Sequence, residues 1–167
     1  SNPQVSNRYY SKTGQVAREA PAGSKLFTAT AYDAVGRTKL VSQAYEPSGH
    51  TAGTDPAALT NAVVLTQQEM FWDAAGNLTS SSSKQRFDTA TGNGDLGNLT
   101  TEPKARTSYE ASYPDALGRT IASANYGTNG SASWTRNPTV PARTDDVLVT
   151  SFAFNTAGNV ASSTDPA

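Results

Sequence analysis

Hydrophobic and polar residues alternate with a period of two along several short segments, which is typical of β-strands with one face packed on a core. The alternation runs through Thr28, Thr30 and Tyr32, through Tyr109, Ala111 and Tyr113, and through Leu148, Thr150, Phe152 and Phe154. No long segment follows the 3.6-residue period of an amphipathic helix. The pattern therefore predicts an all-β fold of short strands joined by turns.

Residues 56–68 fit two patterns. Their alanine, valine and leucine residues suit one or two helical turns, and the β-branched residues from Val63 to Thr66 suit a strand equally well. We predict a strand from Val63 onward.

A short motif recurs along the chain: an aromatic residue, Asp or Asn, two variable residues, Gly, and then Arg or Asn. The matching copies are Tyr32-Asp33-Ala34-Val35-Gly36-Arg37, Trp72-Asp73-Ala74-Ala75-Gly76-Asn77 and Phe154-Asn155-Thr156-Ala157-Gly158-Asn159. A variant with an added proline is Tyr113-Pro114-Asp115-Ala116-Leu117-Gly118-Arg119, and a weaker copy is Tyr10-Ser11-Lys12-Thr13-Gly14-Gln15. Recurrence of this kind is typical of repeat proteins.

The spacing of the copies indicates a duplication. Gly118 follows Gly36 by 82 residues, and Gly158 follows Gly76 by the same 82 residues. The glycines at 76, 97 and 118 are spaced by 21 residues, which indicates a basic unit of about 20 residues. We therefore assign residues 9–163 to a repeat region, with duplicated halves at 33–77 and 115–159 and with terminal tails at 1–8 and 164–167.

The motif has the chemistry of a β-hairpin turn. A type I turn favours Asp, Asn or Ser at its first position and Gly at its fourth, and a three-residue hairpin loop closes when that Gly takes a positive φ. The residues assigned to the turns are Asp33, Gly36, Arg37, Asp73, Gly76, Asn77, Asp115, Gly118, Arg119, Asn155, Gly158 and Asn159. We expect the four glycines of this set to have positive φ angles.

In this hairpin geometry, the aromatic residue just before the turn pairs across the two strands with the residue just after the motif. Tyr32 then faces Thr38, Trp72 faces Leu78 and Phe154 faces Val160, which are pairs that stabilise sheets. Because Tyr32, Trp72 and Phe154 have the same phase relative to their turns, we expect them to be buried on one shared face.

Two stretches rich in Gly, Pro, Asn and Thr, residues 46–60 and 127–146, are predicted to be long loops at equivalent places in the two halves. Loops on a regular scaffold commonly carry binding sites. Tyr45, Tyr126 and Trp134 lie near these loops and are candidates for stacking on sugar rings. The alternative is that these aromatic side chains cap the core of the sheet.

The motif resembles the YD repeat of the rearrangement-hot-spot (RHS) family, and the resemblance covers most of the chain, from about Tyr9 to Ser163. The endings Asn77-Leu78, Asn98-Leu99 and Asn159-Val160 match that repeat as well. The chain departs from it at Pro114, at an enlarged turn over residues 92–95, and where Trp72 and Phe154 replace the Tyr. The family includes bacterial rearrangement-hot-spot proteins, toxin-complex shell components, wall-associated proteins and the teneurins.

This resemblance implies an array of antiparallel β-hairpins that forms a curved continuous sheet, part of a shell or barrel in a larger secreted or cell-surface bacterial protein. The partners that it implies are neighbouring repeats of the same polypeptide, together with an encapsulated toxin domain or a carbohydrate. A carbohydrate-binding or adhesive module is the alternative function. If the chain is a piece of a longer array, its first and last strands lack their hydrogen-bonding neighbours. We therefore also expect edge-to-edge self-association.

Composition argues against several classes of function and of site. The 167 residues include 13 Lys and Arg, 14 Asp and Glu and no cysteine, the net charge is -1, and the mean hydropathy is -0.51. Such a balance provides no basic surface for nucleic acid, and no stretch is apolar enough for a membrane span. No signal sequence is recognised in the chain. The absence of cysteine excludes disulfides and thiolate metal sites.

No catalytic site is predicted, and neither a metal nor a cofactor is expected. The single histidine, His50, lies between Gly49 and Thr51 in a predicted loop and has no nucleophile motif near it. The repeated Asp33, Asp73 and Asp115 are better explained by turns than by paired catalytic carboxylates. Residues 88–98 loosely resemble an oxygen-rich calcium loop, but they lack EF-hand spacing and a bidentate Glu.

Overall fold

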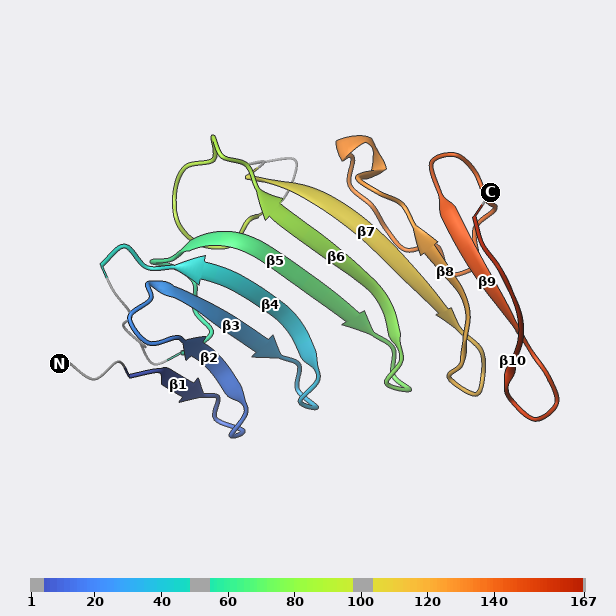
Figure 1. Cartoon of the computed structure of the whole chain (residues 1–167), viewed down its shortest axis with the longest axis horizontal. Coiled ribbons are helices and arrows are strands. Elements are labelled where there is room, and N and C mark those ends of the chain that lie inside the picture. The colour runs from blue at the N-terminus through green and yellow to red at the C-terminus, as the bar shows by residue number, and fades with distance from the viewer. Residues whose placement is uncertain (1–4, 49–54, 98–103, 167) are drawn as a thin grey trace. The chain divides into compact units, whose positions relative to one another are not determined.

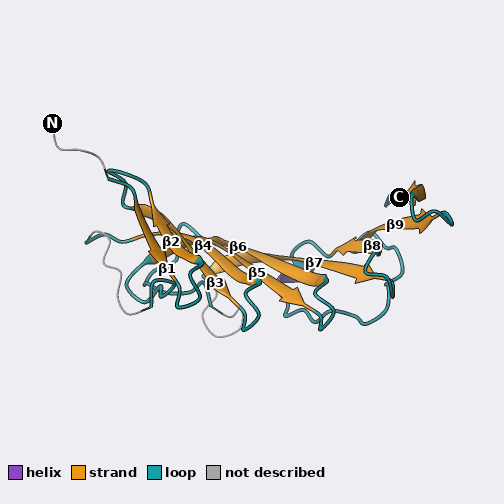
Figure 2. Cartoon of the chain, turned by 90° about the horizontal axis from the view of Figure 1, so that it is seen from below, coloured by secondary structure: helices purple, strands orange, loops and turns teal. Residues whose placement is uncertain are grey.

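The computed structural model describes residues 5–48, 55–97 and 104–166, and its regular structure is almost entirely β (Figures 1 and 2). Ten strands form one antiparallel sheet in which neighbours in the sequence are neighbours in the sheet, from β1 to β10. The strands are β1 (Asn7–Tyr10), β2 (Val16–Ala20), β3 (Leu26–Tyr32), β4 (Thr38–Tyr45), β5 (Val63–Trp72), β6 (Leu78–Arg86), β7 (Ala105–Pro114), β8 (Thr120–Asn125), β9 (Leu148–Phe154) and β10 (Val160–Thr164). The only helical element among the described residues is one 3-10 turn, η1 (Asn129–Ser131). The sheet is the all-β array of antiparallel hairpins that the alternating pattern predicts, and β5 begins at Val63 as expected.

Successive connections of such a meander lie at alternate ends of the strands. The connections after β1, β3, β5, β7 and β9 are the short ones that carry the motif, and each lies at the lower end of its two strands in Figure 1. The connections after β4, β6 and β8 are much longer and lie at the other end. The two predicted loops, 46–60 and 127–146, fall in the connections after β4 and β8.

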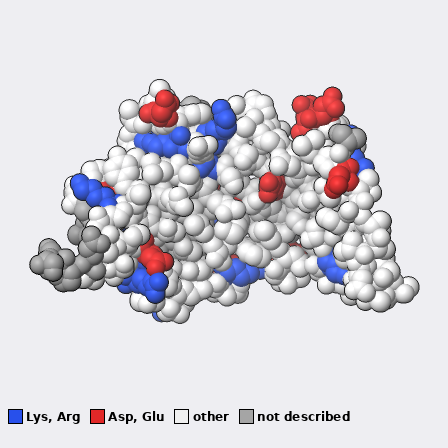
Figure 3. Space-filling view, viewed as in Figure 1, with Lys and Arg blue, Asp and Glu red and all other residues white. Residues whose placement is uncertain are grey.

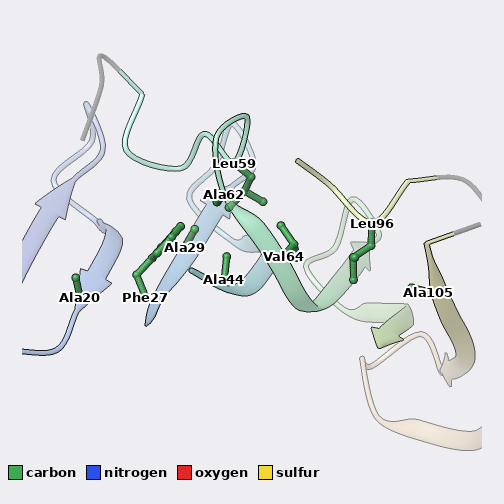
Figure 4. Close-up of a cluster of buried hydrophobic side chains, with 9 residues drawn as sticks. All are labelled: Ala20, Phe27, Ala29, Ala44, Leu59, Ala62, Val64, Leu96 and Ala105. Atoms are coloured by element: carbon green, nitrogen blue, oxygen red, sulfur yellow. The ribbon is translucent and has the colours of Figure 1, made fainter. Parts of the chain in front are cut away.

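The chain divides into two compact units, one within Ser1–Glu69 and Ser83–Arg106 and the other within Met70–Ser82 and Thr107–Ala167. In the first unit, one face of the sheet is covered by the unit's own connections. Its buried cluster consists of Ala20, Phe27, Ala29, Ala44, Leu59, Ala62, Val64, Leu96 and Ala105 (Figure 4). Leu59, Ala62 and Leu96 come from connections, and the other residues come from strands. Because five of the nine residues are alanine, the connecting segments can approach the strands closely.

A buried arginine joins the first unit's sheet to its covering segment. Arg18 on β2 is 2% exposed, and its Nη1 donates to Glu46 Oε1 at 2.9 Å. Its Nε and Nη2 donate to the carbonyl oxygens of Pro56 (2.8 Å) and Ala58 (2.6 Å), and its guanidinium lies 4.1 Å from the ring centroid of Phe27. A buried charge is tolerated when it is paired and hydrogen-bonded in this way.

The second unit has a core of the same kind. Its buried cluster consists of Ala111, Tyr113, Ala122, Ala124 and Val149, with Tyr126, Trp134 and Val147 packed against it. Arg136, from the connection after β8, donates to the carbonyl oxygens of Thr79 and Ser112, each at 3.0 Å. Its guanidinium lies 4.6 Å from the ring centroid of Tyr113, so an arginine again fastens the long connection to the strands.

The opposite face of each unit is polar and more exposed. Gln43 pairs with Thr66 in the first unit, and Glu110 pairs with Asn125 in the second. All four residues are exposed. Figure 3 shows blue and red charged side chains scattered over the surface that faces the viewer, mostly toward its margins, with uncharged residues between them. The sheet therefore has one face closed by connections and one open face on which uncharged polar side chains are frequent.

The expectation that Tyr32, Trp72 and Phe154 are buried is wrong, because all three are half-buried. The reason is that the core covers the other face of the strand. Ala31 pairs with Leu40 and Tyr32 pairs with Thr38, so an extra residue on β4 separates the two pairs. Ala31 shares the core face with Ala29, and alternation along β3 places Tyr32 on the open face. Phe154, next to Ala153 on β9, follows the same rule.

Gly97 does not mark a motif turn, so the spacing of 21 residues on either side of it does not correspond to hairpins. Gly97 has a positive φ of 68°, yet it lies in the connection between β6 and β7 and not in a hairpin turn. The segment before it folds back onto the core, where the N–H of Gly94 donates to the carbonyl oxygen of Ala62 at 2.8 Å. The element that repeats along the sheet is therefore a tight turn, a strand, a connection and a second strand.

Candidate functional site

The five motif turns share one backbone geometry. In the turn after β3, the N–H of Asp33 donates to the carbonyl oxygen of Arg37 at 2.8 Å, and the N–H of Gly36 donates to that of Asp33 at 3.1 Å. The equivalent pairs of bonds occur in the turns at 11–15, 73–77, 115–119 and 155–159. The glycines at 14, 36, 76, 118 and 158 have φ angles of 80°, 89°, 90°, 79° and 82°. These are the positive φ angles that the motif predicts.

The first residue of each turn uses its side chain to cap the turn. Asp33 Oδ1 accepts hydrogen bonds from the N–H groups of Val35 (3.0 Å) and Arg37 (2.8 Å). Asp115 and Asn155 make the same two bonds within their own turns. In the weak first copy, the Oγ of Ser11 takes this role. The shared requirement is a short side chain with an oxygen acceptor, which Asp, Asn and Ser all provide.

The second carboxylate oxygen explains why the motif ends in Arg or Asn. The Nε of Arg37 donates to Asp33 Oδ2 at 2.7 Å, and the Nε of Arg119 donates to Asp115 Oδ2 at 2.8 Å. The Nδ2 of Asn77 donates to Asp73 Oδ2 at 2.9 Å. The two strands of these three hairpins are therefore joined across the turn by side chains as well as by backbone bonds.

Hydrogen bonds hold the pKa of the turn carboxyls below the usual value for Asp. For Asp115 the side chain and then the backbone N–H of Arg119 lower the pKa, and Asn77 has the same effect on the pKa of Asp73. Desolvation raises the pKa of Asp33, but the bonds from Arg37 and Val35 outweigh it and the net pKa is lowered. These carboxylates are anionic acceptors occupied by their own turns, which is unsuited to general acid catalysis.

Neighbouring turns also contact each other, which the sequence analysis did not predict. Within the first unit, the Nε2 of Gln15 donates to the carbonyl oxygen of Gly36 at 2.8 Å. Within the second unit, Asn77 lies against Gly118 so closely that a β-carbon there would be 2.9 Å from its Oδ1. Arg119 reaches the next turn at Gly158, and its guanidinium lies 4.4 Å from the ring centroid of Phe154.

In each of these pairs, the last motif residue of one turn contacts the glycine of the next turn. The sequence carried a signal for this contact, because the last motif residue is always long or polar and the glycine is invariant among the five copies. At Gly118 a β-carbon would collide with Asn77, whereas at Gly36 and Gly158 it would only contact the preceding residue. The turns therefore form a row in which each one positions the next within its unit.

The structure places the three candidate sugar-binding residues in two different units. Tyr126 and Trp134 lie together in the second unit, where the Trp134 ring stacks on Tyr109 with centroids 5.2 Å apart and contacts Tyr126 with centroids 4.9 Å apart. The hydroxyl groups of Tyr126 and Tyr113 are 3.2 Å apart, and burial followed by this hydrogen bond raises the pKa of Tyr113. Tyr45 is in the first unit, half-buried and paired with Leu26 and Val63 on the open face.

An open groove of about 390 Å³ lies in the second unit. Its lining is mainly small and uncharged, and it includes Leu78, Ser112, Ser123, Asn125, Leu148 and Thr150 with Glu110 as its one charged residue. Neither Tyr126 nor Trp134 contributes to it. The groove thus offers hydroxyl and amide groups without an aromatic platform for a sugar ring.

The remaining sequence candidates do not form a site in the described residues. His50 and Asn98 lie outside those residues. Asp95 Oδ1 accepts a hydrogen bond from Gln67 Nε2 at 2.8 Å, and Asp88 Oδ1 accepts one from the adjacent N–H of Thr89 at 2.9 Å. Over the ranges that the structure describes, no three His, Asp or Glu side chains are grouped as metal ligands. Likewise, no helix in those ranges has the length and apolar character to cross a membrane.

No protein-family model matches the chain, and no curated protein matches it either.

We predict that Gly118→Ala destabilises the chain more than Gly14→Ala does. Both positions have φ near 80°, where an added β-carbon costs about 1–2 kcal/mol. Only at Gly118 does that carbon also meet Asn77, which Asp73 holds in place. Chemical denaturation should show a loss of about 2–3 kcal/mol for Gly118→Ala and about 1 kcal/mol for Gly14→Ala. Equal losses, or no recovery on adding Asn77→Ala, would contradict the contact between turns.

We predict that Asp115→Asn lowers stability at pH 7 and weakens its dependence on acid pH. The folded-state pKa of Asp115 is depressed, so its contribution is present above the unfolded-state pKa of about 3.9 and is lost as pH falls through the folded-state pKa. Melting temperatures measured from pH 7 to pH 2 should therefore converge for the two proteins. Asn155→Asp, which recreates the pairing of Asp73 with Asn77, should show the converse. A constant difference at every pH would refute this account.

We predict that Trp134→Ala destabilises the second unit, because its ring packs against the buried cluster and contacts two tyrosines. Loss of a large, partly buried aromatic side chain should cost about 2–3 kcal/mol in denaturant unfolding. Tyr45→Ala serves as the comparison from the first unit. An unchanged stability together with lost binding on a glycan array would instead identify Trp134 as a sugar contact.

Proposed function

We propose that this chain is a structural segment of a longer YD-repeat protein, in which β-hairpins add side by side to build a sheet wall. The observation that carries the proposal is the row of turns, in which the last motif residue of one turn contacts the glycine of the next. Such a contact occurs at Gly36, Gly118 and Gly158, so further turns could be added to a unit through the same two motif positions.

The two faces of the sheet support a wall. In each unit, the connections cover one face of the sheet and the other face is polar and exposed. A wall that separates an enclosed space from the solvent also needs two different faces. In the proposed protein, further repeats lengthen the sheet, and the right-handed twist of antiparallel strands curves it into a shell or barrel. The enclosed space is proposed to hold a toxin or other cargo, and the protein is proposed to be secreted or bound to the bacterial surface.

An enzyme has less support than a wall. The carboxylates that recur in the sequence are each occupied by hydrogen bonds within one turn. A carbohydrate-binding or adhesive module also has less support, because the rings of Tyr126 and Trp134 are engaged with the core and the groove of the second unit lacks an aromatic residue. Sugar stacking requires an accessible ring face.

We predict that lengthening the array stabilises it. The 82-residue period means that residue 167 corresponds to residue 85, so a second copy of residues 86–167 added after Ala167 continues the register. The added strands should cover the β10 edge and raise the melting temperature by about 5–10 °C. The melts are recorded near 1 µM, which is roughly dilute enough to limit association between molecules.

The matched control carries the same 82 added residues in shuffled order, which preserves length and composition without the motif. Its melting temperature should equal that of the original chain. If the in-register copy gives no more stability than the shuffled one, the chain is a self-contained domain and the wall is refuted. The binding module would then become the preferred function.

A further inference from the structure

The sequence contains two Asn-Gly pairs, Asn93-Gly94 and Asn129-Gly130. Asparagine followed by glycine is the pair most prone to spontaneous loss of the side-chain amide, because glycine has no side chain to obstruct attack by its backbone nitrogen on the asparagine side chain. One pair lies in the connection after β6 and the other in the connection after β8, at the 3-10 turn η1 (Figure 1). Their surroundings separate a protected pair from a reactive one.

The backbone nitrogen of Gly94 is held by the core of the first unit. Its N–H donates to the carbonyl oxygen of the buried Ala62 at 2.8 Å, and Gly94 forms a β-bridge with Val63. The Nδ2 of Asn93 donates to the carbonyl oxygen of Asn61 at 3.3 Å. The Gly94 nitrogen must give up its hydrogen bond before it can attack. Asn93 is therefore protected although its side chain is exposed.

The backbone nitrogen of Gly130 is not held in this way. Within the described ranges its N–H donates no hydrogen bond, whereas those of Asn129 and Ser131 do. A 3-10 bond from Gly130 would use the carbonyl oxygen of Gly127, which instead accepts from the N–H of Tyr109 at 2.9 Å. Gly130 is also exposed, so solvent reaches this nitrogen.

The turn around this nitrogen is strained. Asn129, Gly130 and Ser131 have φ angles of 48°, 60° and 63°, so three successive residues are left-handed although two of them carry a β-carbon. This conformation is unfavourable for residues other than glycine. Closing a ring between the Gly130 nitrogen and the Asn129 side chain requires the turn to open briefly, and the strain lowers the cost of that opening.

We propose that Asn129 is a site of spontaneous deamidation in the folded chain and that Asn93 is not. The Gly130 nitrogen loses its proton and forms a bond to Cγ of Asn129, and the Cγ–Nδ2 bond breaks so that the amide leaves as ammonia. Water then opens the resulting succinimide at either of its carbonyl carbons and yields aspartate or isoaspartate. This inference does not depend on the proposed function.

The modification affects the segment that covers the core of the second unit. The Nδ2 of Asn129 donates to the carbonyl oxygen of Ser133 at 3.1 Å, and a carboxylate cannot donate this bond. Ser133 precedes Trp134, whose ring packs against the buried cluster. Isoaspartate also lengthens the main chain by one carbon ahead of that ring. We therefore expect deamidation to loosen residues 132–136.

Peptide mapping by mass spectrometry tests the site. The folded chain is incubated at mildly alkaline pH in water labelled with heavy oxygen, which enters the product when the succinimide opens. The peptide with Asn129 should gain the label at least about tenfold faster than the peptide with Asn93. The same chain in urea is the control, because both pairs are then free of structure and the two rates should agree within about twofold.

Hydrogen exchange tests the consequence. Exchange of residues 132–136 should be faster in Asn129→Asp and in the deamidated chain than in the unmodified chain. Asn93→Asp is the matched control, since it makes the same chemical change in the first unit, and it should leave the exchange of residues 132–136 unchanged. No acceleration in Asn129→Asp would refute the effect on the second unit.

Three results of the labelling experiment would overturn the proposed site. The first is a rate at Asn93 that equals or exceeds the rate at Asn129 in the folded chain. The second is an Asn129 that reacts in urea but not in the folded chain. The third is the same ratio of rates in urea as in the folded chain, because the difference would then come from the local sequence and not from the structure.

Discussion

The side-chain cap on a three-residue turn is the interaction on which the rest of this structure depends. An oxygen from Asp, Asn or Ser holds two backbone N–H groups, and the glycine with positive φ closes the loop. This turn forces an extra residue into the following strand, as between Thr38 and Leu40. That bulge determines which side chains of the following strand face the core and which face solvent.

The closed and open faces follow from this register. Small residues such as Ala29, Ala44 and Ala124 lie on the core face, where connecting segments pack closely, and residues such as Gln43 and Asn125 lie on the other. The motif aromatics Tyr32 and Phe154 lie beside their turns on the open face, whereas Tyr113, which Pro114 separates from its turn, is buried in the core. Phe154 is therefore covered by an arginine from the neighbouring turn and not by a connection. The cover comes from outside the hairpin, which makes each hairpin depend on its neighbour.

The turns, the hairpins and the start of β5 could be predicted because they depend on local chemistry within a few residues. The burial of the aromatics could not, since it depends on which face of the sheet the irregular connections cover, and alternation along a strand does not specify that face. The burial of Arg18 was also beyond prediction, because its partners Glu46 and Ala58 are far along the chain in irregular segments. The contact of Asn77 with Gly118 is similar, since it joins two motifs that appear independent in the sequence.

The arginines that fasten the long connections have a consequence for how this chain can vary. Arg18 binds the carbonyl oxygens of Pro56 and Ala58, and Arg136 binds those of Thr79 and Ser112. Every amino acid supplies a carbonyl oxygen, so these attachments recognise the path of the backbone and not the identity of the residues along it. In the first unit, the side chains at 56 and 58 can therefore vary while the connection remains fixed to Arg18, whereas in the second unit the connection must keep Arg136 and it is the strand side chains at 79 and 112 that can vary.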